Sequence, residues 1–402
     1  MKILVINAVS SSVKYQLIDM ENEKLQAKGT ADLIGIDGGK FTHKVKGRED
    51  YKINVQMDNH AQAIQLVIDT LISKENGVIS SLGEISAVGH RVLHGGEKFS
   101  GSVIVTPDVI AAIEECSELG PLHNPHNLTG IRACEKLMPG VPQVAVFDTG
   151  FHQTMPDFAY MYALPYEYYE KYHIRRYGFH GTSHRYVSMR AAALLGKKPE
   201  ELRIVTCHLG NGSSVSAVKN GKCFDTSMGL TPLEGIMMGT RCGSIDPAII
   251  PLLMKKEGLT ADEVDAVLNK KSGILGITQK TSDNRDVEAG AKTGDKRCQL
   301  VEAMLVHQLT KLVGGYAAAM GGVDAIVFTG GIGENNPHYR ERVAKNLAFM
   351  GVQIDEERNA GIRSSQGEQD LSAPGATVKM LMIPTNEELM IAKDTAELTG
   401  KK

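Results

Sequence analysis

The sequence lacks several features that mark particular classes of protein. Its six cysteines are scattered without a CxxC pair, which argues against a zinc or disulfide framework and favours reduced thiols. The 44 lysines and arginines are balanced by 47 aspartates and glutamates, so the chain has no basic footprint for nucleic acid. No apolar run approaches the ~20 residues of a membrane span, and the first apolar strand soon turns polar. We therefore expect a cytoplasmic protein with small-molecule partners, with neither nucleic acid nor membrane among them.

Motifs for phosphate and metal binding are also missing. There is no GxxxxGK[ST] segment, which excludes a P-loop. The segment "GGIGENN" (330–336) falls short of a GxGxxG fingerprint because Asn336 stands at its third glycine. An HExxH segment is absent as well. Any nucleotide site in this chain must therefore be built from other turns.

The order of apolar and polar segments predicts two closely packed domains. A chain of 402 residues that is 42% hydrophobic can bury more than one core. Residues 2–20 read as strand, polar turn and strand, and residues 203–218 repeat this pattern. The repetition suggests a duplicated fold. A third apolar strand (324–329) leads through glycines into a helical pattern (338–351), and further helices are expected at 60–74 and 297–320.

Two glycine-rich turns are candidates for contact with a nucleotide. "HLGNGSSV" (208–215) and "GGIGENN" (330–336) both follow apolar strands, where backbone N–H groups can approach a polyphosphate without interference from a Cβ. Either turn alone could equally be an ordinary hairpin or helix cap. Their combination favours a nucleotide.

Cationic and imidazole groups lie in several glycine-flanked segments. Arg91 and Arg241 could form the planar clamp that phosphoryl transfer needs, although an isolated arginine is more often a surface ion pair. His180 and His184 have the i, i+4 spacing of zinc ligands on a helix. We rank the zinc interpretation lower because Gly181 weakens the helix.

Three side chains could supply hard oxygen ligands. Asp148 ends an apolar strand, at the edge where α/β proteins commonly bind ligands, although it could instead cap the next turn. Asn7, Asp148 and Glu387 together would suit Mg²⁺, which uses few protein ligands and keeps several waters. Thr385 and Glu388 have the spacing of a capping box, which would leave Glu387 free.

A series of distinctive segments runs from end to end of the chain: "GHRVLHGGEKF", "PLHNPHN", "VFDTGFH", "RRYGFHGTSHRYV", "HLGNGSS", "TSMGLTPLEGIMMGTR", "IDPAI", "SDNRDVE", "FTGGIGEN" and "IPTNEELMIA". In these segments the whole chain resembles the acetate kinases, within the acetate and sugar kinase/Hsp70/actin superfamily. The opening "VINAVSSSVKYQL" matches a family pattern that usually has glycine at position 9. So many motifs in the same order are highly specific.

The resemblance implies an α/β fold of two domains with duplicated actin-like (ribonuclease H-like) topology and an interdomain cleft. The expected domains are 1–149 completed by 387–402, and a nucleotide-binding domain at 150–386. The implied activity is that of a phosphotransferase with a carboxyl group as acceptor. It would transfer the γ-phosphoryl group of ATP directly and reversibly to acetate, giving acetyl phosphate and ADP, with Mg²⁺ or alternatively Mn²⁺. A propionate or short-chain acyl kinase, or a nucleotide-binding relative without turnover, is the alternative. The family also implies a homodimer.

The resemblance further assigns roles to individual residues. The catalytic group comprises Arg91, Asp148, His180 and Arg241. The metal site would use Asn7 and Glu387. Substrate contacts would come from Arg91, Leu93, Leu122, His123, Phe179 and Pro232. Nucleotide contacts would come from Lys14, His208, Leu209, Gly210, Asn211, Gly212, Asp283, Asn284, Arg285, Gly331, Ile332, Gly333, Glu334 and Asn335.

Four positions depart from the family pattern. Val9 would strain the first turn if its φ were positive, or displace its neighbours; with a negative φ it would only narrow the site. We expect slower catalysis than with glycine there. Cys242 and Ser244 replace the serine and aspartate of "TRSGDIDP", which removes one carboxylate near Arg241. Leu93 is bulkier than the expected valine and should disfavour propionate.

Overall fold

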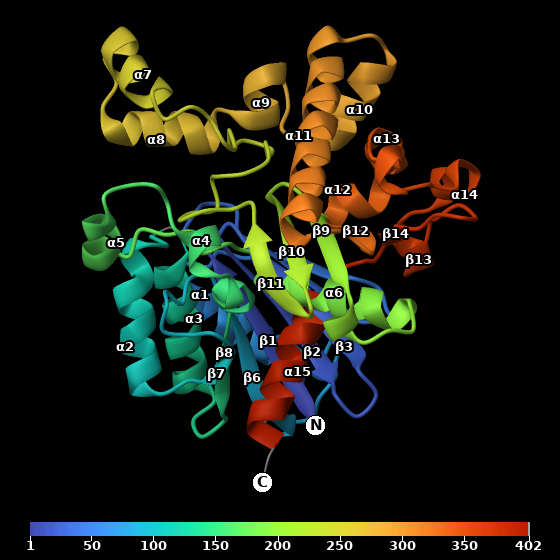
Figure 1. Cartoon of the computed structure of the whole chain (residues 1–402). Coiled ribbons are helices and arrows are strands. Elements are labelled where there is room, and N and C mark those ends of the chain that lie inside the picture. The colour runs from blue at the N-terminus through green and yellow to red at the C-terminus, as the bar shows by residue number, and fades with distance from the viewer. Residues whose placement is uncertain (122, 401–402) are drawn as a thin grey trace. The chain divides into compact units, whose positions relative to one another are not determined.

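The computed structural model describes residues 1–121 and 123–400, which divide into two compact units. Unit 1 comprises Met1–Gln153 and Asn386–Lys402, and unit 2 comprises Thr154–Thr385. Each unit is a mixed β-sheet with helices packed on it (Figure 1). In the described part of the chain, no helix is both long and apolar enough to cross a membrane.

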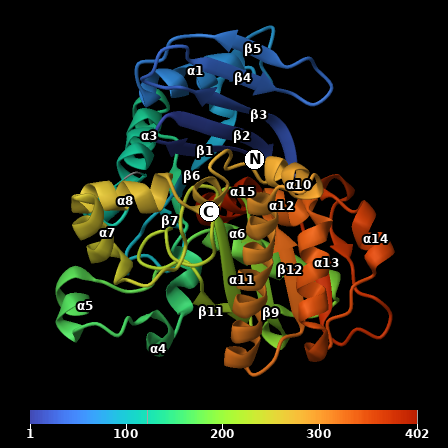
Figure 2. The same ribbon diagram turned by 90° about the horizontal axis from the view of Figure 1, so that it is seen from above.

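Unit 1 is built on an eight-stranded sheet in the order β5-β4-β3-β2-β1-β6-β8-β7. Figure 2 shows β5 to β1 following one another in this order. Its strands are β1 (Lys2–Val9), β2 (Ser12–Asp19), β3 (Lys24–Asp32), β4 (Lys40–Lys44), β5 (Tyr51–Asn54), β6 (Ile85–Val92), β7 (Val103–Ile104) and β8 (Gln143–Phe147). Its helices are α1 (His60–Ile72), α2 (Pro107–Glu115), α3 (Asn124–Leu137) and α15 (Glu387–Gly400).

Alternating side chains of β1 are buried on both faces of this sheet. Leu4 and Ile6 pack in a core that includes residues of α1 and α3. Ile3 and Val5 face the other way and pack with Ile391 of α15, the helix that Figure 1 shows running alongside β1 and β6. Strands buried on both faces read as continuous apolar runs, as β1 does. The carboxyl-terminal helix thus completes unit 1.

Unit 2 repeats the strand order of unit 1 on a six-stranded sheet, β11-β10-β9-β12-β14-β13. In both sheets an antiparallel three-stranded meander is followed by two parallel strands, which confirms the predicted duplicated α/β fold of actin-like topology. The strands are β9 (Arg203–Leu209), β10 (Ser213–Lys219), β11 (Lys222–Thr226), β12 (Ala325–Thr329), β13 (Gln369–Asp370) and β14 (Lys379–Met382).

The long helix α11 (Lys296–Met320) supplies much of the core of unit 2. Its Val301, Leu305, Leu309 and Val313 recur at helical spacing and pack in a cluster with side chains of β9, β10 and β12. The other helices are α4 (Asp157–Tyr160), α5 (Tyr166–Tyr172), α6 (Gly181–Leu194), α7 (Ile249–Glu257), α8 (Ala261–Lys270), α9 (Gly273–Thr278), α10 (Asn284–Lys292), α12 (Gly330–Asn335), α13 (Pro337–Asn346) and α14 (Glu356–Gly361).

The structure differs from two local predictions. The glycine-rich stretch after β12 is itself the helix α12, because the positive φ of Gly330, +76°, turns the chain at a single residue. The capping box at Thr385 and Glu388 is wrong. Asn386 caps α15 instead, since its Oδ1 accepts a hydrogen bond from the backbone N–H of Leu389 at 3.1 Å.

Candidate active site

In unit 1, three predicted site residues lie at the carboxyl ends of adjacent parallel strands. Asn7 is near the end of β1, Arg91 lies opposite Val146 in the pairing of β6 with β8, and Asp148 directly follows β8. Strands that run in parallel deliver these ends to one edge of the sheet. The sheet topology therefore collects an amide, a guanidinium and a carboxylate at that edge.

Arg91 and Asp148 form a two-pronged ion pair. Nε of Arg91 donates to Oδ1 of Asp148 at 2.9 Å, and Nη2 donates to Oδ2 at 2.7 Å. The side chain of Asp148 is 2% exposed and that of Arg91 is 22% exposed. Burial alone would lower the pKa of Arg91, but the charge of Asp148 raises it above its usual value. The pair thus fixes a charged guanidinium whose Nη1 is not engaged with Asp148.

The predicted metal ligands of unit 1 fit a hard divalent cation. The side-chain oxygen of Asn7 is buried and, within the described residues, has no hydrogen-bond partner. Glu387 is the first residue of α15, the helix that packs on β1 and β6. Its burial raises its pKa to about 7, with nearby Asp148 adding to the rise and Arg91 opposing it. A bound cation would give the oxygen of Asn7 a partner and would stabilise the ionised form of Glu387.

This donor set is small. Within residues 1–121 and 123–400, no group of three or more histidine, cysteine, aspartate or glutamate side chains could hold a metal ion. A site of one amide and one carboxylate suits Mg²⁺, which keeps several waters. The alternative zinc interpretation of His180 and His184 fails, because each imidazole instead makes a hydrogen bond to Ser214 of β10.

Other predicted residues of unit 1 lie around these groups. Lys14 of β2 pairs with Asn7 of β1 in the strand register and is exposed. Leu93 is buried just after β6, and His123 precedes α3. Leu122, which we predicted to contact the substrate, lies outside the described residues.

The backbone at Val9 does not have the strained conformation. Val9 is the last residue of β1, pairs with Ser12 of β2, and does not have a positive φ. Its carbonyl oxygen lies 2.6 Å from Nε2 of His60, the first residue of α1. The strain interpretation is therefore wrong: an extended strand end accommodates a β-branched residue.

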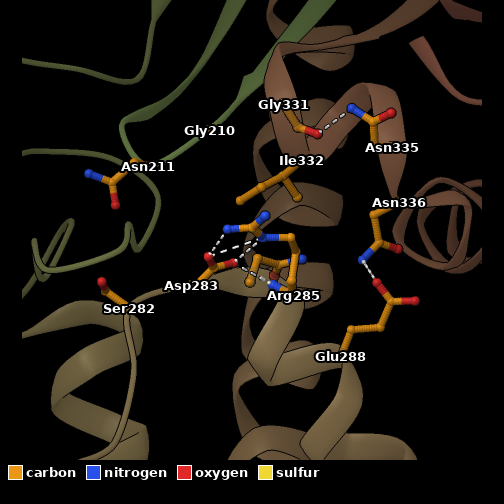
Figure 3. Close-up of a pocket in the computed structure, with 11 residues that line it drawn as sticks. Gly210, Asn211, Ser282, Asp283, Arg285, Glu288, Gly331, Ile332, Asn335 and Asn336 are labelled. Carbon is orange, nitrogen blue, oxygen red and sulfur yellow. Dashed lines mark hydrogen bonds and ion pairs between the residues drawn. The ribbon is translucent and has the colours of Figure 1, made fainter. Parts of the chain in front are cut away.

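Unit 2 contains a cavity of about 440 Å³ that gathers three of the segments predicted to bind a nucleotide. In Figure 3, Gly210 and Asn211, from the β9–β10 turn, lie across from Gly331 and Asn335 of α12. Asp283 and Arg285, from the start of α10, lie below both groups in this view. The full lining comprises Gly210, Asn211, Ser282, Asp283, Asn284, Arg285, Glu288, Gly331, Ile332, Asn335 and Asn336.

Asp283 and Arg285 are tied to each other within this cavity. Asp283 caps α10, since its Oδ1 accepts from the backbone N–H of Arg285 at 2.8 Å, and Nε of the Arg285 side chain donates to the same oxygen at 3.0 Å. These hydrogen bonds from Arg285 lower the pKa of Asp283 to about 2. The cavity thus holds a carboxylate that is ionised at neutral pH next to an exposed guanidinium.

Three residues of the predicted nucleotide set also make contacts within the fold of unit 2. Leu209 is part of the core of unit 2. Gly333 packs against the backbone at the ends of β9 and β12. Glu334 accepts hydrogen bonds from the backbone N–H of Gly330 at 2.8 Å and of Thr385 at 3.1 Å, and burial raises its pKa. They shape the turn that lines the cavity.

His180, Gly212 and Arg241 come together beside the same turn. A Cβ placed on Gly212 would lie 3.5 Å from Nε2 of His180 and 3.6 Å from Nη1 of Arg241. The ring of His180 also stacks on that of His208, with their centroids 4.3 Å apart. Two cationic or imidazole groups thus converge on one glycine of the turn.

Arg241 donates hydrogen bonds to a backbone carbonyl oxygen and to the sulfur of Met238. Its Nη1 donates to the carbonyl oxygen of Pro232 at 3.0 Å, and burial lowers its pKa. Among the described residues it forms no ion pair with a carboxylate. Ser244, which stands where the family pattern has aspartate, makes a contact within the loop: its Oγ accepts a hydrogen bond from the backbone N–H of Gly235 at 3.0 Å. Within the described residues, the positive charge of Arg241 therefore has no carboxylate beside it.

Two more predicted substrate residues, Phe179 and Pro232, belong to unit 2. Phe179 is 1% exposed and immediately precedes His180, while Pro232 is the carbonyl partner of Arg241.

Cys242 is partly buried, and its thiol donates to the carbonyl oxygen of Gly243 at 3.1 Å. Burial raises the pKa of this thiol.

Some residues that organise the site were not predicted. Asn127 of α3 donates to the carbonyl oxygen of Ala8 at 2.6 Å and accepts from the backbone N–H of Leu93 at 3.0 Å, so it ties the ends of β1 and β6 together. It lies in the polar segment "LHNPHN", which carries part of the family resemblance but predicts no role for Asn127 itself. Ser214 of β10, which bonds to both His180 and His184, gave no distinguishing signal in the sequence.

Comparison with known proteins decides the family. Residues 2–393 match the model of the acetokinase family. The chain belongs to this family. It is 59% identical over 399 residues to the acetate kinase of Caldanaerobacter subterraneus subsp. tengcongensis, which covers 99% of each chain. As a member of the acetokinase family, the chain is a kinase.

Solved structures agree with this assignment. The chain is similar to the crystal structure of Porphyromonas gingivalis acetate kinase, with a TM-score of 0.95, 48% identity and 99% of both chains covered. It is also similar to a propionate kinase from Francisella tularensis, with a TM-score of 0.92, 41% identity and 99% of both chains covered. The acetokinase fold thus extends over the whole chain and is shared with a propionate kinase.

Proposed function

We propose that this chain catalyses the reversible transfer of the γ-phosphoryl group of ATP to acetate, giving acetyl phosphate and ADP. The observation that carries the proposal is the cavity of about 440 Å³ in which the β9–β10 turn and the starts of α10 and α12 meet. These are the segments that match the family's nucleotide-binding motifs. The same proposal places the acceptor beside Arg91 and makes the chain a cytoplasmic homodimer.

The acceptor needs orientation more than activation. Acetate is ionised at neutral pH, so its attack on phosphorus requires no general base. Arg91 is held on one side by Asp148 through Nε and Nη2, and its Nη1 would bind the acetate carboxylate. We assign Asp148 to the orientation of Arg91, a role that a buried ion pair serves directly.

Charge on the transferred phosphoryl group needs partners that are not already neutralised. Arg241, which has a partly buried guanidinium without a carboxylate partner in the described chain, would stabilise that charge together with His180. Both lie beside Gly212, where the absence of a Cβ leaves room for phosphate oxygens. Lys14, His208 and the backbone of the β9–β10 turn would complete the phosphate contacts.

Asn7 and Glu387 would hold the divalent cation, Mg²⁺ or Mn²⁺. When bound, the cation would neutralise phosphate oxygens of the nucleotide. The chain's own contribution is to present the buried oxygen of Asn7 and to keep Glu387 positioned at the start of α15 by its cap, Asn386. Asn7 lies near the end of β1, and Glu387 begins the helix that packs on β1.

By family resemblance, we assign contact with the methyl group of acetate to Leu93, Leu122, His123, Phe179 and Pro232. The bulk of Leu93 should limit the acyl chain, which favours acetate over propionate even though a propionate kinase shares the fold. A pocket distinguishes one methylene group by roughly 10- to 200-fold. We therefore expect kcat/KM for propionate to fall well below that for acetate, and equal values would contradict this assignment.

A coupled assay tests the proposed activity. Purified chain is mixed with ATP, and formation of ADP is followed with acetate and Mg²⁺ present together and with each omitted. ADP should form only in the complete mixture. ADP formation that does not depend on acetate would indicate an ATPase instead, and light scattering of the same sample tests the proposed homodimer.

A further inference from the structure

A chain of hydrogen bonds leads from His180 into the sheet of unit 2. Nδ1 of His180 lies 2.8 Å from Oγ of Ser214, and the same Oγ lies 2.7 Å from Nε2 of His184. On the far side, Nδ1 of His184 lies 2.7 Å from Oγ1 of Thr206 on β9. We infer that Ser214 and His184 are positioning residues for the phosphoryl transfer, because they hold the imidazole of His180 through Nδ1 and turn Nε2 toward Gly212 and Arg241.

The ring of His180 needs such a support. His180 has a φ of +57°, a left-handed conformation that a residue with a Cβ adopts at a cost, and it stands just before the first residue of α6. Its ring stacks on His208, whose Nδ1 lies 2.8 Å from Oγ of Ser183 on α6. Stacking on His208 fixes the plane of the His180 ring, and the bond to Ser214 fixes the orientation of the ring within that plane.

Burial makes this support rigid. The side chains of Ser214, His184 and Thr206 are all fully buried, so water does not compete for their hydrogen bonds. Ser214 can donate its single hydroxyl proton to only one of the two imidazoles that it contacts. The tautomer of His184 and the tautomer of neutral His180 are therefore linked through the hydroxyl of Ser214.

The alternative acceptor available to Thr206 favours one direction of donation. If Thr206 donates to His184 and His184 donates to Ser214, then Ser214 donates to Nδ1 of His180, and all three bonds measure 2.7 to 2.8 Å. The opposite direction requires Thr206 to donate to the carbonyl oxygen of Ser216 at 3.5 Å, which is at the limit of a hydrogen bond. In the favoured direction the proton of neutral His180 sits on Nε2.

This placement has a consequence for the reaction, and it rests on the proposed function. A proton on Nε2 faces the place where Gly212 leaves room, so neutral His180 can donate a hydrogen bond to an oxygen of the transferred phosphoryl group. The imidazole then does not need a positive charge to stabilise the transition state. Ser214 and His184 act through His180 and do not touch the substrate.

A pair of serine variants tests the inference. Ser214→Ala removes the bond to His180, whereas Ser216→Ala is a matched control, because Ser216 is an equally buried serine two residues along the same strand that bonds to Thr226 instead. We expect Ser214→Ala to lower kcat roughly tenfold with little change in either KM, because an imidazole without its support would lose its own hydrogen bond to the phosphoryl group in the transition state. Ser214→Thr, which keeps the hydroxyl, should recover most of the activity.

A spectroscopic readout separates the inference from the proposed function. In protein with ¹⁵N-labelled histidine, the signals of His180 are assigned with a His180→Asn variant and measured in the wild type, Ser214→Ala and Ser216→Ala without substrates. Neutral His180 should carry its proton on Nε2 in the wild type and in Ser216→Ala, and should lose this preference in Ser214→Ala. Unchanged tautomers and unchanged kcat in Ser214→Ala would overturn the inference. Failure of the wild type to phosphorylate acetate would instead overturn the proposed function, and the tautomer would still test the positioning role.

Discussion

Arg91 donates two hydrogen bonds to Asp148, at 2.9 and 2.7 Å, from the ends of neighbouring parallel strands. Two prongs fix the plane of the guanidinium, which a single bond would leave free to rotate. The orientation of the acceptor carboxylate would therefore depend on Asp148 as well as on Arg91.

Replacing either partner should affect acetate more than ATP. We expect Arg91→Lys to raise KM for acetate and to lower kcat/KM by about 100-fold or more, because an ammonium keeps the charge but cannot form the two-pronged pair. Asp148→Asn should give a similar loss and a lower Tm, since it leaves the partly buried charge of Arg91 without its partner. Arg132→Ala, which breaks an exposed pair with Glu114, is the control and should change neither. Steady-state kinetics with varied acetate decide the matter, and an unchanged KM for acetate in Arg91→Lys would contradict the role.

Arg241 should act mainly on the chemical step. Its guanidinium has no carboxylate partner in the described chain, and it lies beside Gly212 and His180. Arg241→Ala should therefore lower kcat by orders of magnitude with a modest change in KM, as expected of a group that binds charge developed in the transition state. Single-turnover measurements of ADP formation would show the loss directly. An effect confined to KM would count against this role.

Two glycine variants should separate catalysis from stability. Gly212→Ala introduces a methyl group 3.5 to 3.6 Å from His180 and Arg241, which is an ordinary contact, so Tm should hardly change while kcat falls. Gly330→Ala is the contrast. Its φ is +76° and the new Cβ would lie 2.7 Å from the carbonyl oxygen of Leu209, so this variant should lose stability by ~1 kcal/mol or more. Thermal unfolding and kinetics on both variants test the distinction, and a large fall in Tm for Gly212→Ala would contradict it.

Much of this site could be predicted from the sequence because it depends on strand ends and glycines. An apolar strand followed by Asp148, and a glycine turn followed by an alternating strand, are local patterns that the sheets preserve. The family resemblance then joined segments that are far apart in the chain. The cavity in unit 2 brings several of these segments together, while the role of each residue there stays a prediction.

Other features depend on tertiary contacts that local patterns do not encode. Thr385 and Asn386 are both suitable helix caps, but the hydroxyl of Thr385 lies 2.7 Å from Oγ of Ser183, and the cap of α15 is Asn386. The φ of Val9 follows from its pairing with Ser12, so the strain suspected there is absent. Ser214 looks like any other strand serine until His180 and His184 are seen on either side of it.

Glu387 should make stability depend on pH in the absence of metal. The pKa of its carboxyl is about 7 in the folded chain and ordinarily 4.5. Between these values the folded chain keeps a proton that the unfolded chain has lost, so the free energy of unfolding falls as pH rises from about 4.5 to about 7. Glu387→Gln should remove this part of the slope, as seen in denaturant unfolding with a chelator present. Above pH 7, Mg²⁺ should stabilise the wild type and have little effect on Glu387→Gln; equal stabilisation of both would contradict the metal assignment.

The most direct test of the proposed reaction follows the phosphorus atom. The chain is incubated with ATP, Mg²⁺ and acetate, and ³¹P NMR records the products as they form. We expect a signal for acetyl phosphate to appear in step with ADP, and added ADP and acetyl phosphate to regenerate ATP. ADP that appears together with inorganic phosphate and no acetyl phosphate would contradict it.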